Sequence, residues 1–469
     1  MLKVVRIGLK TLGIIAGALL ALILIWFAIN LVDEDLKPAT QALIASPSNP
    51  YAPEDNIYVA LVGFDAPSNR SVIEDGSARI ADFNRALDSM QADPDKALAY
   101  LQKSDLNKLE FRGDLSSWSL LTSSIWSSTK AHHDQVAALV KANQELYLRY
   151  ISLHARHGYF ETARPSPMAP IGHVPTAARI LFLADVANRV QTGTKKERYA
   201  ALSDLKEDLL LWRAVLRGNG TLVSKMIACV NLHGDLLLIG DMITDPQTEL
   251  MPFDSEAASL VSPFSIADWS LGDVFVAEMR VSDSLYREIV QQKYTPRQLA
   301  DREATWWNRT YNAIGLQFFK LHATENLEAE FIEKRRELAD ADPGEFSRAH
   351  LAYEAWLEQR ISFTSPRTLY NPMGKVLVWI GNSGEYEDYI LRAYDIAAMQ
   401  RLVCLAYQIR RQNVRASAVP IFMSQHTEWA THPVNRVPFR WDGEARTLTA
   451  LPTGKQPSDR RFSLQLPIS

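Results

Sequence analysis

The sequence predicts a mainly α-helical protein with an N-terminal single transmembrane helix, a large α-helical array and a small β-rich C-terminal segment. Residues 11–32 form an uncharged apolar run, residues 76–412 follow helical spacing, and the chain after residue 415 is richer in proline and β-formers. The predicted order is a cytoplasmic N-terminus (1–10), a transmembrane anchor (11–32), a stalk (33–55), an α-helical body (56–415, with a possible subdivision near 245–265) and a C-terminal extended or β-hairpin segment (416–469).

The anchor is predicted from residues 11–32, which read TLGIIAGALLALILIWFAINLV and contain no charged side chain. A membrane-spanning helix needs about 20 apolar residues. Lys3, Arg6 and Lys10 precede the run, and acidic residues follow it at positions 33–35. Because positive residues stay on the cytoplasmic side, we expect a single-pass protein of the inner (plasma) membrane with its N-terminus in the cytoplasm and its body in the periplasm or another extracytoplasmic compartment.

Two alternatives to the anchor fit the apolar run less well. A cleaved signal peptide has an apolar core of about 7–15 residues and a small-residue cleavage site. This core is longer, and residues 27–30 (FAIN) offer no small-x-small pattern. A core helix of a soluble protein would have a polar face, which this run lacks. Trp26 and Phe27 near its outer end also favour a membrane span, because aromatic residues prefer the headgroup zone.

The composition and charge of the chain limit the class of protein and the partners that we expect. The 469 residues are 47% apolar and 22% charged, as in folded globular proteins, and the net charge is −4. A mildly acidic chain without a basic block gives no electrostatic footprint for nucleic acid, so none is expected as a partner. Residues 34–53 are polar and contain four prolines, which predicts a stalk that lifts the body off the membrane.

Caps and prolines mark the expected helices of the body. A short helix capped by Asp55 or Asn56 is expected first, although Ile57, Val59 and Leu61 also fit a strand. The remaining expected helices are 77–92, one starting at 93–94, one or two over 116–157, then 176–192, 195–217, 221–244, 268–293, one from 295 through Trp306 and Trp307, 325–341, 342–363, a short one from 371–372, and 386–412.

The segment after residue 415 predicts short strands. Residues 439–441 and 448–450 flank the turn signal Asp442-Gly443, and residues 462–466 form a possible third strand. No repeat of fixed length occurs, so no named solenoid is assigned. Paired helices joined by short capped turns still indicate a helical array.

The two cysteines, Cys229 and Cys404, lie in apolar helix-like runs. An exported protein could pair them, but we expect two buried free thiols, since a buried cysteine behaves as a small hydrophobe. Their spacing is not that of a metal site. Three glycosylation-type tripeptides, which begin at Asn69, Asn219 and Asn308, would matter only in a eukaryotic secretory pathway.

Histidines and carboxylates offer few metal or catalytic patterns. His132-His133-Asp134 are adjacent, and adjacent helical residues point about 100° apart, so we expect a solvated helix face. His154 and His157 at i, i+3 could face one site, but no third ligand is near in sequence. Glu325, Glu328, Glu330 and Glu333, followed by Lys334, Arg335 and Arg336, predict a charge-laced exposed helix; paired catalytic acids would need separations that a sequence does not show.

Lys225 lies among apolar neighbours in TLVSKMIACVNL (221–232), which predicts a buried ammonium group. A buried lysine needs a partner or a shifted pKa. We expect an ion pair with a carboxylate of an adjacent helix; snorkelling to the surface and a catalytic role are the alternatives. The preceding helix carries Asp204, Glu207 and Asp208, but the start of the helix that holds Lys225 should meet the end of that preceding helix, so the partner could come from elsewhere.

Two segments resemble parts of uncharacterised, membrane-anchored, helix-rich envelope proteins of Gram-negative bacteria. One is residues 56–67 (NIYVALVGFDAP), with Gly76 further on; the other is residues 433–442 (PVNRVPFRWD). In the similar proteins the second segment reads Asp-Pro-Phe-x-Gly-x-Pro-Phe-Arg-Tyr, whereas here His432 replaces the acid and Arg436 replaces the glycine. Both departures bear on any calcium or turn role of that pattern. The resemblance covers about 25 residues and implies an anchored, helical envelope protein without a known activity.

Two functions from different classes remain. The first is a membrane-tethered extracytoplasmic binding or interaction module for a protein or envelope component, with the tryptophans Trp118, Trp126, Trp306 and Trp307 as interface or core residues. The second is an envelope hydrolase with a His/Asp/Glu site assembled from distant helices. The sequence contains no G-x-S-x-G, phosphate-loop, dinucleotide or zinc-protease motif, so we assign no catalytic, cofactor-binding or metal-ligating residue and no cofactor. A pocket holding His154 or His157 beside carboxylates would favour the hydrolase.

Overall fold

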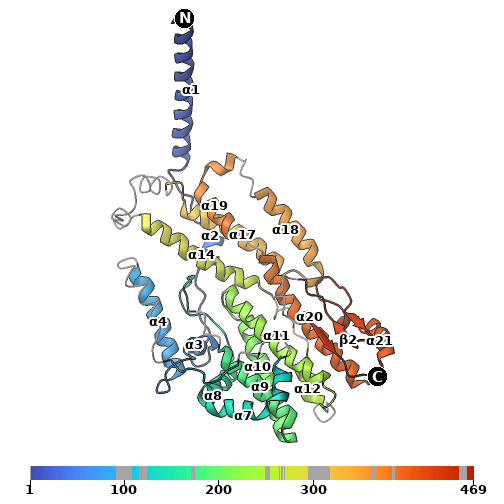
Figure 1. The fold of residues 1–469 in the computed structure, drawn as a ribbon. Helices are drawn as coiled ribbons and strands as arrows, with labels where there is room; N and C mark the ends of the chain where they lie inside the picture. Colours follow the sequence, from blue (N-terminus) through green and yellow to red (C-terminus); the bar gives the residue numbers. More distant parts are fainter. Residues whose placement is uncertain are drawn as a thin grey trace. The chain divides into compact units, whose positions relative to one another are not determined.

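The computed structural model describes residues 2–90, 108–115, 118, 124–170, 175–248, 254–262, 265, 268, 270–293, 317–360, 366–382, 386–453 and 462–468. The chain divides into two compact units. Unit 1 comprises Met1–Ser46, Met279–Arg335 and Leu351–Gly384, and unit 2 comprises Pro47–Glu278, Arg336–His350 and Glu385–Ser469. Both are mainly helical (Figure 1), as predicted. The units interleave along the sequence, because each consists of three separate segments of the chain.

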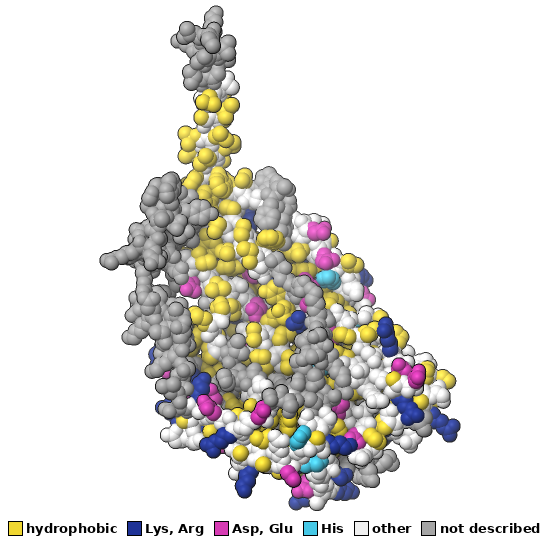
Figure 2. Space-filling view, viewed as in Figure 1, with side chains coloured by type: hydrophobic (Ala, Val, Ile, Leu, Met, Phe, Trp, Pro, Cys, Tyr) yellow, Lys and Arg dark blue, Asp and Glu magenta, His cyan; other side chains and the backbone are white. Residues whose placement is uncertain are grey.

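The N-terminal helix α1 (Leu2–Ile29) is a single helix of 28 residues. Its segment Lys10–Ile29 has a mean hydropathy of 2.8, and none of it is buried. Figure 2 shows hydrophobic side chains on the surface of the described part of this helix. Helix α11 (Leu222–Thr244) is also long and apolar enough to span a membrane, but 78% of it is buried within its own unit.

Unit 1 packs aromatic side chains against its helices. Its described elements are α1, α2 (Pro38–Ile44), the later part of α14 (Gly272–Lys293), most of α17 (Leu321–Ala339), the later part of α18 (Phe346–Arg360), the 3-10 turn η4 (Pro366–Leu369) and α19 (Pro372–Asn382). Tyr286, Phe319, Phe331 and Val378 form a buried apolar cluster of this unit. This cluster joins α14, α17 and α19, which are distant in sequence.

The C-terminal end of α1 packs against other residues of unit 1. The Trp26 ring stacks on Phe318 with ring centroids 4.3 Å apart, and the Trp26 indole donates to the Leu369 carbonyl at 2.8 Å. Asn30 is only 3% exposed; its side-chain oxygen accepts from the Asn371 backbone N–H at 2.8 Å. Polar groups at the end of the apolar helix are therefore satisfied by the unit that follows.

The first part of the segment predicted to be a stalk, as far as Ser46, belongs to unit 1 and contacts α17. The Asp33 carboxylate accepts from the backbone N–H groups of His322 and Ala323, at 3.0 and 3.1 Å, at the start of α17. A carboxylate at a helix N-terminus satisfies free N–H groups and complements the helix dipole. Pro38 then starts α2, in which Thr40 is buried. Proline favours the first turn of a helix as well as extended linkers, which explains the difference.

Unit 2 is built around four long helices. They are α9 (Thr176–Thr192), α10 (Lys195–Arg217), α11 and α20 (Tyr386–Arg411). Helix α10 packs between α9 and α11, and α11 packs on α20. These boundaries match the predicted ones within about one residue, because local signals set them: Thr194 and Glu197, for example, form a capping box at the start of α10.

Unit 2 also contains shorter elements, several of which pack on these helices. They are α3 (Ile57–Val62), α4 (Val72–Met90), α6 (Ser124–Ala131), α7 (His133–Ala142), α8 (Gln144–Ser152), η1 (Leu153–Ala155), α12 (Asp254–Leu260), η3 (Pro343–Glu345), η5 (Ala416–Ala418), α21 (Val419–Gln425) and α22 (Thr427–Ala430). The ambiguous segment after Asn56 is thus a helix, and Asn56 caps it by accepting from Tyr58 N–H at 3.0 Å. The described part of residues 116–157 holds three short helices instead of one or two long ones.

The C-terminal strands form one antiparallel sheet in the order β1 (Arg440–Asp442), β2 (Thr447–Thr449) and β3 (Ser463–Gln465). Leu448 pairs with Trp441 on one side and Leu464 on the other. Strand β3 packs on α11, where a Cβ on Gly240 would lie 2.6 Å from Leu464. The predicted strands are confirmed.

Three other predictions need correction or fall outside the described residues. Helix α14 begins at Gly272 and not at Asp268, because the buried Asp268 carboxylate accepts from Ser265 N–H and pairs with Arg213. Residues 416–430 hold short helices, so the extended segment starts later than predicted. The helices expected from residues 93–94 and 295–296 lie mostly or wholly outside the described residues.

Candidate functional site

The residues of unit 2 that come closest to a catalytic constellation surround Arg179. We define the Arg179 cluster as Arg179 on α9, Asp208 and Trp212 on α10, Asn231 and Asp235 on α11, and Tyr150 and His154 on α8 and η1. Helical spacing places Asp208 and Trp212 on one face of α10, and Asn231 and Asp235 on one face of α11. The packing of α10 against α9 and α11 then brings these faces together.

Hydrogen bonds connect the whole cluster. Arg179 lies between two carboxylates: Nη2 is 3.2 Å from Asp208 Oδ2 and also contacts Asp235 Oδ1. The same nitrogen donates to the Asn231 carbonyl at 2.7 Å. Asp208 Oδ1 accepts from the Tyr150 hydroxyl at 2.6 Å and lies 3.1 Å from His154 Nε2. The Asp208 carboxylate therefore contacts three other members of the cluster: Arg179, Tyr150 and His154.

The two carboxylates have opposite electrostatic environments. Burial would raise the pKa of Asp208, but Arg179 and then His154 outweigh burial, and the pKa is lowered. For Asp235, burial and the adjacent Asp208 charge outweigh Arg179, so its pKa is raised well above its usual value. Arg179 and His154 thus favour the charged form of Asp208, whereas burial and the Asp208 charge favour the neutral form of Asp235.

The cluster has groups for acid–base chemistry but no open access. A histidine beside a carboxylate is suited to general-base catalysis. However, Arg179, Asp208 and Asp235 are 0% exposed, and the His154 side chain is only 8% exposed. Arg179 Nε and Nη1 and Asp235 Oδ2 are buried without a hydrogen-bond partner. As described, the cluster joins α8, α9, α10 and α11 inside a packed core.

The other histidines selected from the sequence do not join this cluster. His154 and His157, which at i, i+3 could have faced one site, do not lie on one helical segment, because η1 ends at Ala155 and His157 is exposed in the loop after it. His132 Nδ1 lies 2.9 Å from the Ser128 carbonyl, whereas His133 Nδ1 lies 2.9 Å from Asn188 Oδ1. These adjacent histidines have different partners, and they do not share a helix, because His132 lies between α6 and α7 and His133 begins α7.

Lys225 is buried as predicted, at 1% exposure, but its hydrogen-bond partners are not carboxylates. Its ammonium nitrogen donates to the Val215 carbonyl at 2.8 Å and to the Gly218 carbonyl. Val215 belongs to the last turn of α10, where carbonyls have no partner within the helix. A cation at this end also complements the helix dipole. The expected ion pair is absent from the described contacts of Lys225 because the end of α10 replaces it.

A polar group lies around Lys225. Its nitrogen is 5.7 Å from the centre of the Tyr159 ring, and the Tyr159 hydroxyl lies 2.9 Å from both Glu161 Oε1 and Ser224 Oγ. Burial lowers the pKa of Lys225 to about 7, and the negative charge of Glu161 opposes this shift. Lys225 is thus a lysine whose charge changes near neutral pH.

The carboxylate-rich segment 325–336 is not the exposed helix that its charges predict. Glu325 and Glu328 on α17 are buried, at 1% and 5% exposure, and Arg335 is buried as well. Arg287 Nη2 is 3.0 Å from Glu325 Oε1, and Arg287 Nε is 2.9 Å from Asp283 Oδ2. We call Asp283, Arg287 and Glu325 the Arg287 triad of unit 1.

One carboxyl group of the Arg287 triad, that of Glu325, has a raised pKa. Burial, together with a hydrogen bond to Asp283, raises the pKa of Glu325 to about 8. Burial also raises the pKa of Glu328, which accepts from the Tyr286 hydroxyl at 3.1 Å and from Asn382 at 3.0 Å. Two neighbouring acids, one of them protonated, are a general acid–base arrangement in principle, and the carboxylates of the triad are mostly buried.

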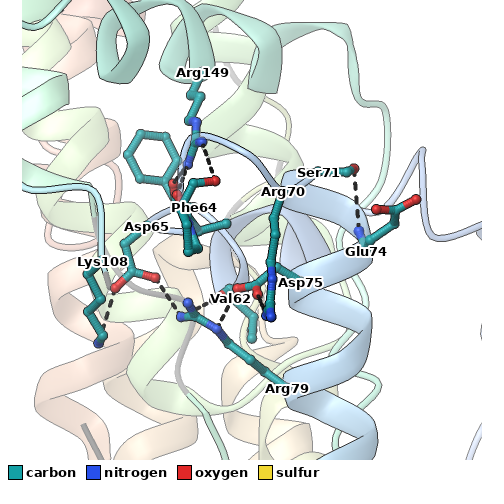
Figure 3. Close-up of polar contacts among 12 residues, drawn as sticks. Val62, Phe64, Asp65, Arg70, Ser71, Glu74, Asp75, Arg79, Lys108 and Arg149 are labelled. Carbon is teal, nitrogen blue, oxygen red and sulfur yellow. Dashed lines mark hydrogen bonds and ion pairs between the residues drawn. The ribbon is translucent and has the colours of Figure 1, made fainter. Parts of the chain in front are cut away.

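The first segment with a family resemblance is a packed structural element. Residues 57–66 are buried throughout, and Asp65 accepts from Arg79 at 2.5 Å and pairs with Lys108 at 3.1 Å. Figure 3 shows Arg79 between Asp65 and Asp75, while Arg149 reaches the carbonyls of the loop. Burial would raise the pKa of Asp65, but Arg79 and Lys108 together lower it.

The structure explains why residue 76 is a glycine: a side chain there would collide with the backbone of α3. A Cβ on Gly76 would lie 2.1 Å from the Val59 carbonyl oxygen, and one on Gly63 would lie 2.0 Å from the Val72 carbonyl oxygen. The backbones of α3 and α4 therefore approach each other closely. Both glycines serve this packing, which requires residues without side chains.

The second segment with a resemblance keeps a turn despite its two departures. Arg436 has a positive φ of 57°, a conformation that favours glycine. His432 N–H donates to the Val437 carbonyl at 3.0 Å, and His432 Nδ1 accepts from Val434 N–H at 3.2 Å. The buried imidazole thus caps the turn as an acidic side chain would. His432 Nε2 is also 3.1 Å from Asp395.

The tryptophans and cysteines pack inside unit 2. Trp118 and Trp126 are both 7% exposed, and the Trp126 indole donates to Asp245 at 2.9 Å. They are core residues in this arrangement; Trp306 and Trp307 lie outside the described residues. Cys229 and Cys404 are buried free thiols, as predicted, and burial raises the pKa of Cys404 to about 11.

Arg179, Asp208 and Asp235 were not selected as site residues from the sequence. The criterion that selected Lys225, a charge among apolar neighbours, also applies to Asp235 in residues 232–240 (LHGDLLLIG) and to Arg179 in residues 177–184 (AARILFLA). It would have identified buried charges, but not their mutual contacts.

No family model matches the chain, and searches of curated proteins and of solved structures likewise give no match.

Proposed function

We propose that the chain is a single-pass inner-membrane protein whose extracytoplasmic body acts as a binding or interaction module of the cell envelope. The proposal combines the apolar helix α1, in which none of the segment Lys10–Ile29 is buried, with its charge asymmetry: Lys3, Arg6 and Lys10 precede the apolar segment and Asp33 follows it. This orientation assigns the N-terminus to the cytoplasm and both folded units to the opposite side.

The observation that carries the proposal is the attachment of α1 to unit 1. Trp26 and Asn30, at the outer end of the apolar helix, bond to the backbone of Leu369 and Asn371, and Asp33 caps α17. Unit 1 is therefore fixed to the anchor without a flexible spacer. Such an attachment suits a protein that presents a folded body at a constant position near the membrane, where partners meet it at high local concentration.

A binding role is favoured over catalysis because the acid–base groups of both units are engaged in packing. The Arg179 cluster is enclosed in the core of unit 2, and its ionised carboxylate is held by Arg179, Tyr150 and His154. The alternative, an envelope hydrolase, draws support from the His154–Asp208 contact. It would require opening of the core to admit substrate.

The topology can be tested with reporters fused after Ser469. A reporter that is active only outside the cytoplasm should be active in this fusion, and a reporter that is active only in the cytoplasm should be silent. The reverse pattern would place the body in the cytoplasm and contradict the proposal.

The binding role can be tested by site-specific photo-crosslinking in cells. Leu148, Leu210, Val223 and Ile421 are large apolar residues of unit 2 with at least 42% exposure. A discrete crosslinked product at one or two of these positions, with none at the others, would support an interaction surface. His154→Gln separates the two functions: a folded His154→Gln protein should retain that product and complement a deletion, whereas loss of complementation with an unchanged product would favour the hydrolase.

A further inference from the structure

Helix α19 of unit 1 has one buried and one apolar exposed face. Gly374, Val378 and Asn382 repeat at four-residue intervals and are buried; a Cβ on Gly374 would lie 2.0 Å from the Thr324 hydroxyl of α17. The opposite face carries large apolar side chains that are exposed. We define the α19 stripe as Leu369 of η4 (50% exposed) with Met373 (42%), Val376 (37%), Trp379 (38%) and Ile380 (60%).

The stripe residues of α19 share one side of the helix. Residues 373, 376 and 380 are spaced by three and four, and Trp379 lies beside them. Leu369 lies at the end of η4, which Asn371, with a positive φ of 50°, separates from α19. Scattered apolar residues on a surface are ordinary, but a contiguous apolar patch marks an interaction site. In α19 the single charged residue is Lys375, whose ammonium donates to the Tyr370 carbonyl at 2.6 Å beside the stripe.

The stripe begins where α1 ends. The Leu369 carbonyl accepts from the Trp26 indole and from the Asn30 side chain, both at 2.8 Å. The Tyr370 hydroxyl donates to the Val32 carbonyl at 3.2 Å. These contacts lie within unit 1. Leu369 is therefore at the same level as the aromatic outer end of the apolar helix, which is the level of the membrane–water interface if α1 spans the bilayer.

We propose that the α19 stripe docks on the outer surface of the bilayer that α1 spans, with its apolar side chains among the headgroups and upper acyl chains. This rests on the proposed membrane anchoring of α1. An amphipathic helix in the interface plane buries its apolar face about 5–10 Å into the headgroup and acyl boundary. Trp379 and Tyr370 have the amphipathic rings that this zone favours.

Membrane docking explains a surface that would otherwise disfavour solubility. The stripe residues are the exposed side of a helix that has tight contacts with α17 on its other side, so they are held in place and cannot fold inward. Two points of contact, α1 and the α19 stripe, would also fix the orientation of unit 1 on the membrane. A single helix alone would leave the unit free to rotate about the helix axis.

The test uses the full-length protein reconstituted in vesicles of phosphatidylethanolamine and phosphatidylglycerol. Val376→Cys and Ile380→Cys each provide a site for an environment-sensitive fluorophore, while the native thiols of Cys229 and Cys404 are buried. Ile421→Cys, at 62% exposure on α21 of unit 2, is the matched control, and Leu19→Cys in α1 reports the anchor itself. Unlabelled parent protein treated with the same reagent measures background labelling.

The expected result is a blue-shifted emission at positions 376 and 380, with stronger quenching by lipids brominated at a shallow acyl position than by lipids brominated deeply. The label at position 421 should keep the emission of an aqueous fluorophore, and the label at position 19 should be quenched most by the deep lipid. Far-ultraviolet circular dichroism of each labelled protein verifies that the helices are retained.

Each other outcome contradicts the proposal in a distinguishable way. Aqueous emission at 376 and 380 with deep quenching at 19 overturns stripe docking and leaves the anchor intact. Aqueous emission at 19 as well overturns the membrane anchoring itself. A blue shift at 376 and 380 that brominated lipids do not quench assigns the stripe to a protein contact, such as a second copy, and equal quenching at 421 removes the special role of the stripe.

Discussion

Both units contain one arginine between two carboxylates, but the two arrangements differ in burial. In unit 2, Arg179 is 0% exposed between Asp208 and Asp235. In unit 1, the Arg287 side chain is 42% exposed between Asp283 and the buried Glu325. Each arrangement retains a carboxyl group with a raised pKa, Asp235 in one and Glu325 in the other.

The difference shows that the exposure of an ion pair to water decides how much the pair contributes to the stability of the fold. A guanidinium that reaches water is hydrated whether or not its partner is present, so its pairs contribute little to stability. A guanidinium enclosed in the core depends on its partners, and its partners depend on it. We therefore expect the same substitution to have very different consequences in the two units.

Arg179→Met should have the largest effect. It would leave the ionised Asp208 in the core with only the Tyr150 and His154 contacts, and breaking a buried pair costs about 3–5 kcal/mol. The measurement is denaturant unfolding of the purified protein in detergent, followed by hydrogen exchange of peptides from α9, α10 and α11 so that unit 2 is observed separately.

Arg287→Met is the matched control for this prediction. Asp283 and Arg287 are both in contact with solvent, so the loss should stay below about 1 kcal/mol, observed in peptides of α14 and α17. Equal losses for the two substitutions would contradict the role assigned to burial.

Lys225 adds a third case to this comparison, because backbone carbonyls, and not carboxylates, accept hydrogen bonds from this buried cation. Lys225→Met tests how much these hydrogen bonds stabilise the fold. The substitution removes the donor to the Val215 and Gly218 carbonyls. A buried acceptor left without its donor costs about 1–3 kcal/mol. Protection of α10 and α11 against hydrogen exchange should fall by that amount, without an additional functional defect in variants that remain folded.

The same substitution should change the pH dependence of stability. The folded pKa of Lys225 is about 7 and its reference value is 10.5. Between these values the unfolded chain binds one more proton than the folded chain, so the unfolding free energy of the parent should rise with pH by at most about 1.4 kcal/mol per pH unit. Lys225→Met should lack this rise; an unchanged slope would show that another group titrates.

Glu325→Gln should have a smaller effect of opposite sign. The folded pKa of Glu325 is about 8 and its reference value is 4.5, so the folded chain holds the extra proton in this window. The stability of unit 1 in the parent should therefore fall as pH rises from about 5 to 8, by less than about 1.4 kcal/mol per unit because exposed Arg287 lets solvent screen the pair. Hydrogen exchange of α17 at several pH values would reveal a flatter profile in Glu325→Gln.

Arg436→Gly should have the smallest effect and tests a site outside both ion-pair arrangements. The positive φ at Arg436 strains a residue with a side chain, and its contact with Asp342 is long, at 3.9 Å, between exposed groups. Relief of strain and the greater freedom of glycine in the unfolded chain oppose each other, so we expect a gain below about 1 kcal/mol. A clear loss of melting temperature would mean that the Arg436 side chain stabilises the turn.

The sequence by itself determined the local features of this protein. The ends of α9, α10 and α11 follow from short-range signals such as the Thr194–Glu197 capping box, and the β1–β2 turn follows from Asp442-Gly443. Burial of Lys225 also follows from its neighbours. These features depend on interactions between residues that are close in the chain, and such interactions are encoded in composition and spacing.

Only the tertiary structure decided which charges meet and which reach water. Glu325 is buried because Arg287, 38 positions away in sequence, packs on it, and Asp208 meets Arg179 and Asp235 because α10 packs between α9 and α11. Lys225 has the end of α10 as its partner because the backbone supplies acceptors that a list of side chains does not show. The free energy of a charge depends on its three-dimensional surroundings, so helical periodicity predicts where a residue lies on its helix but not what lies opposite.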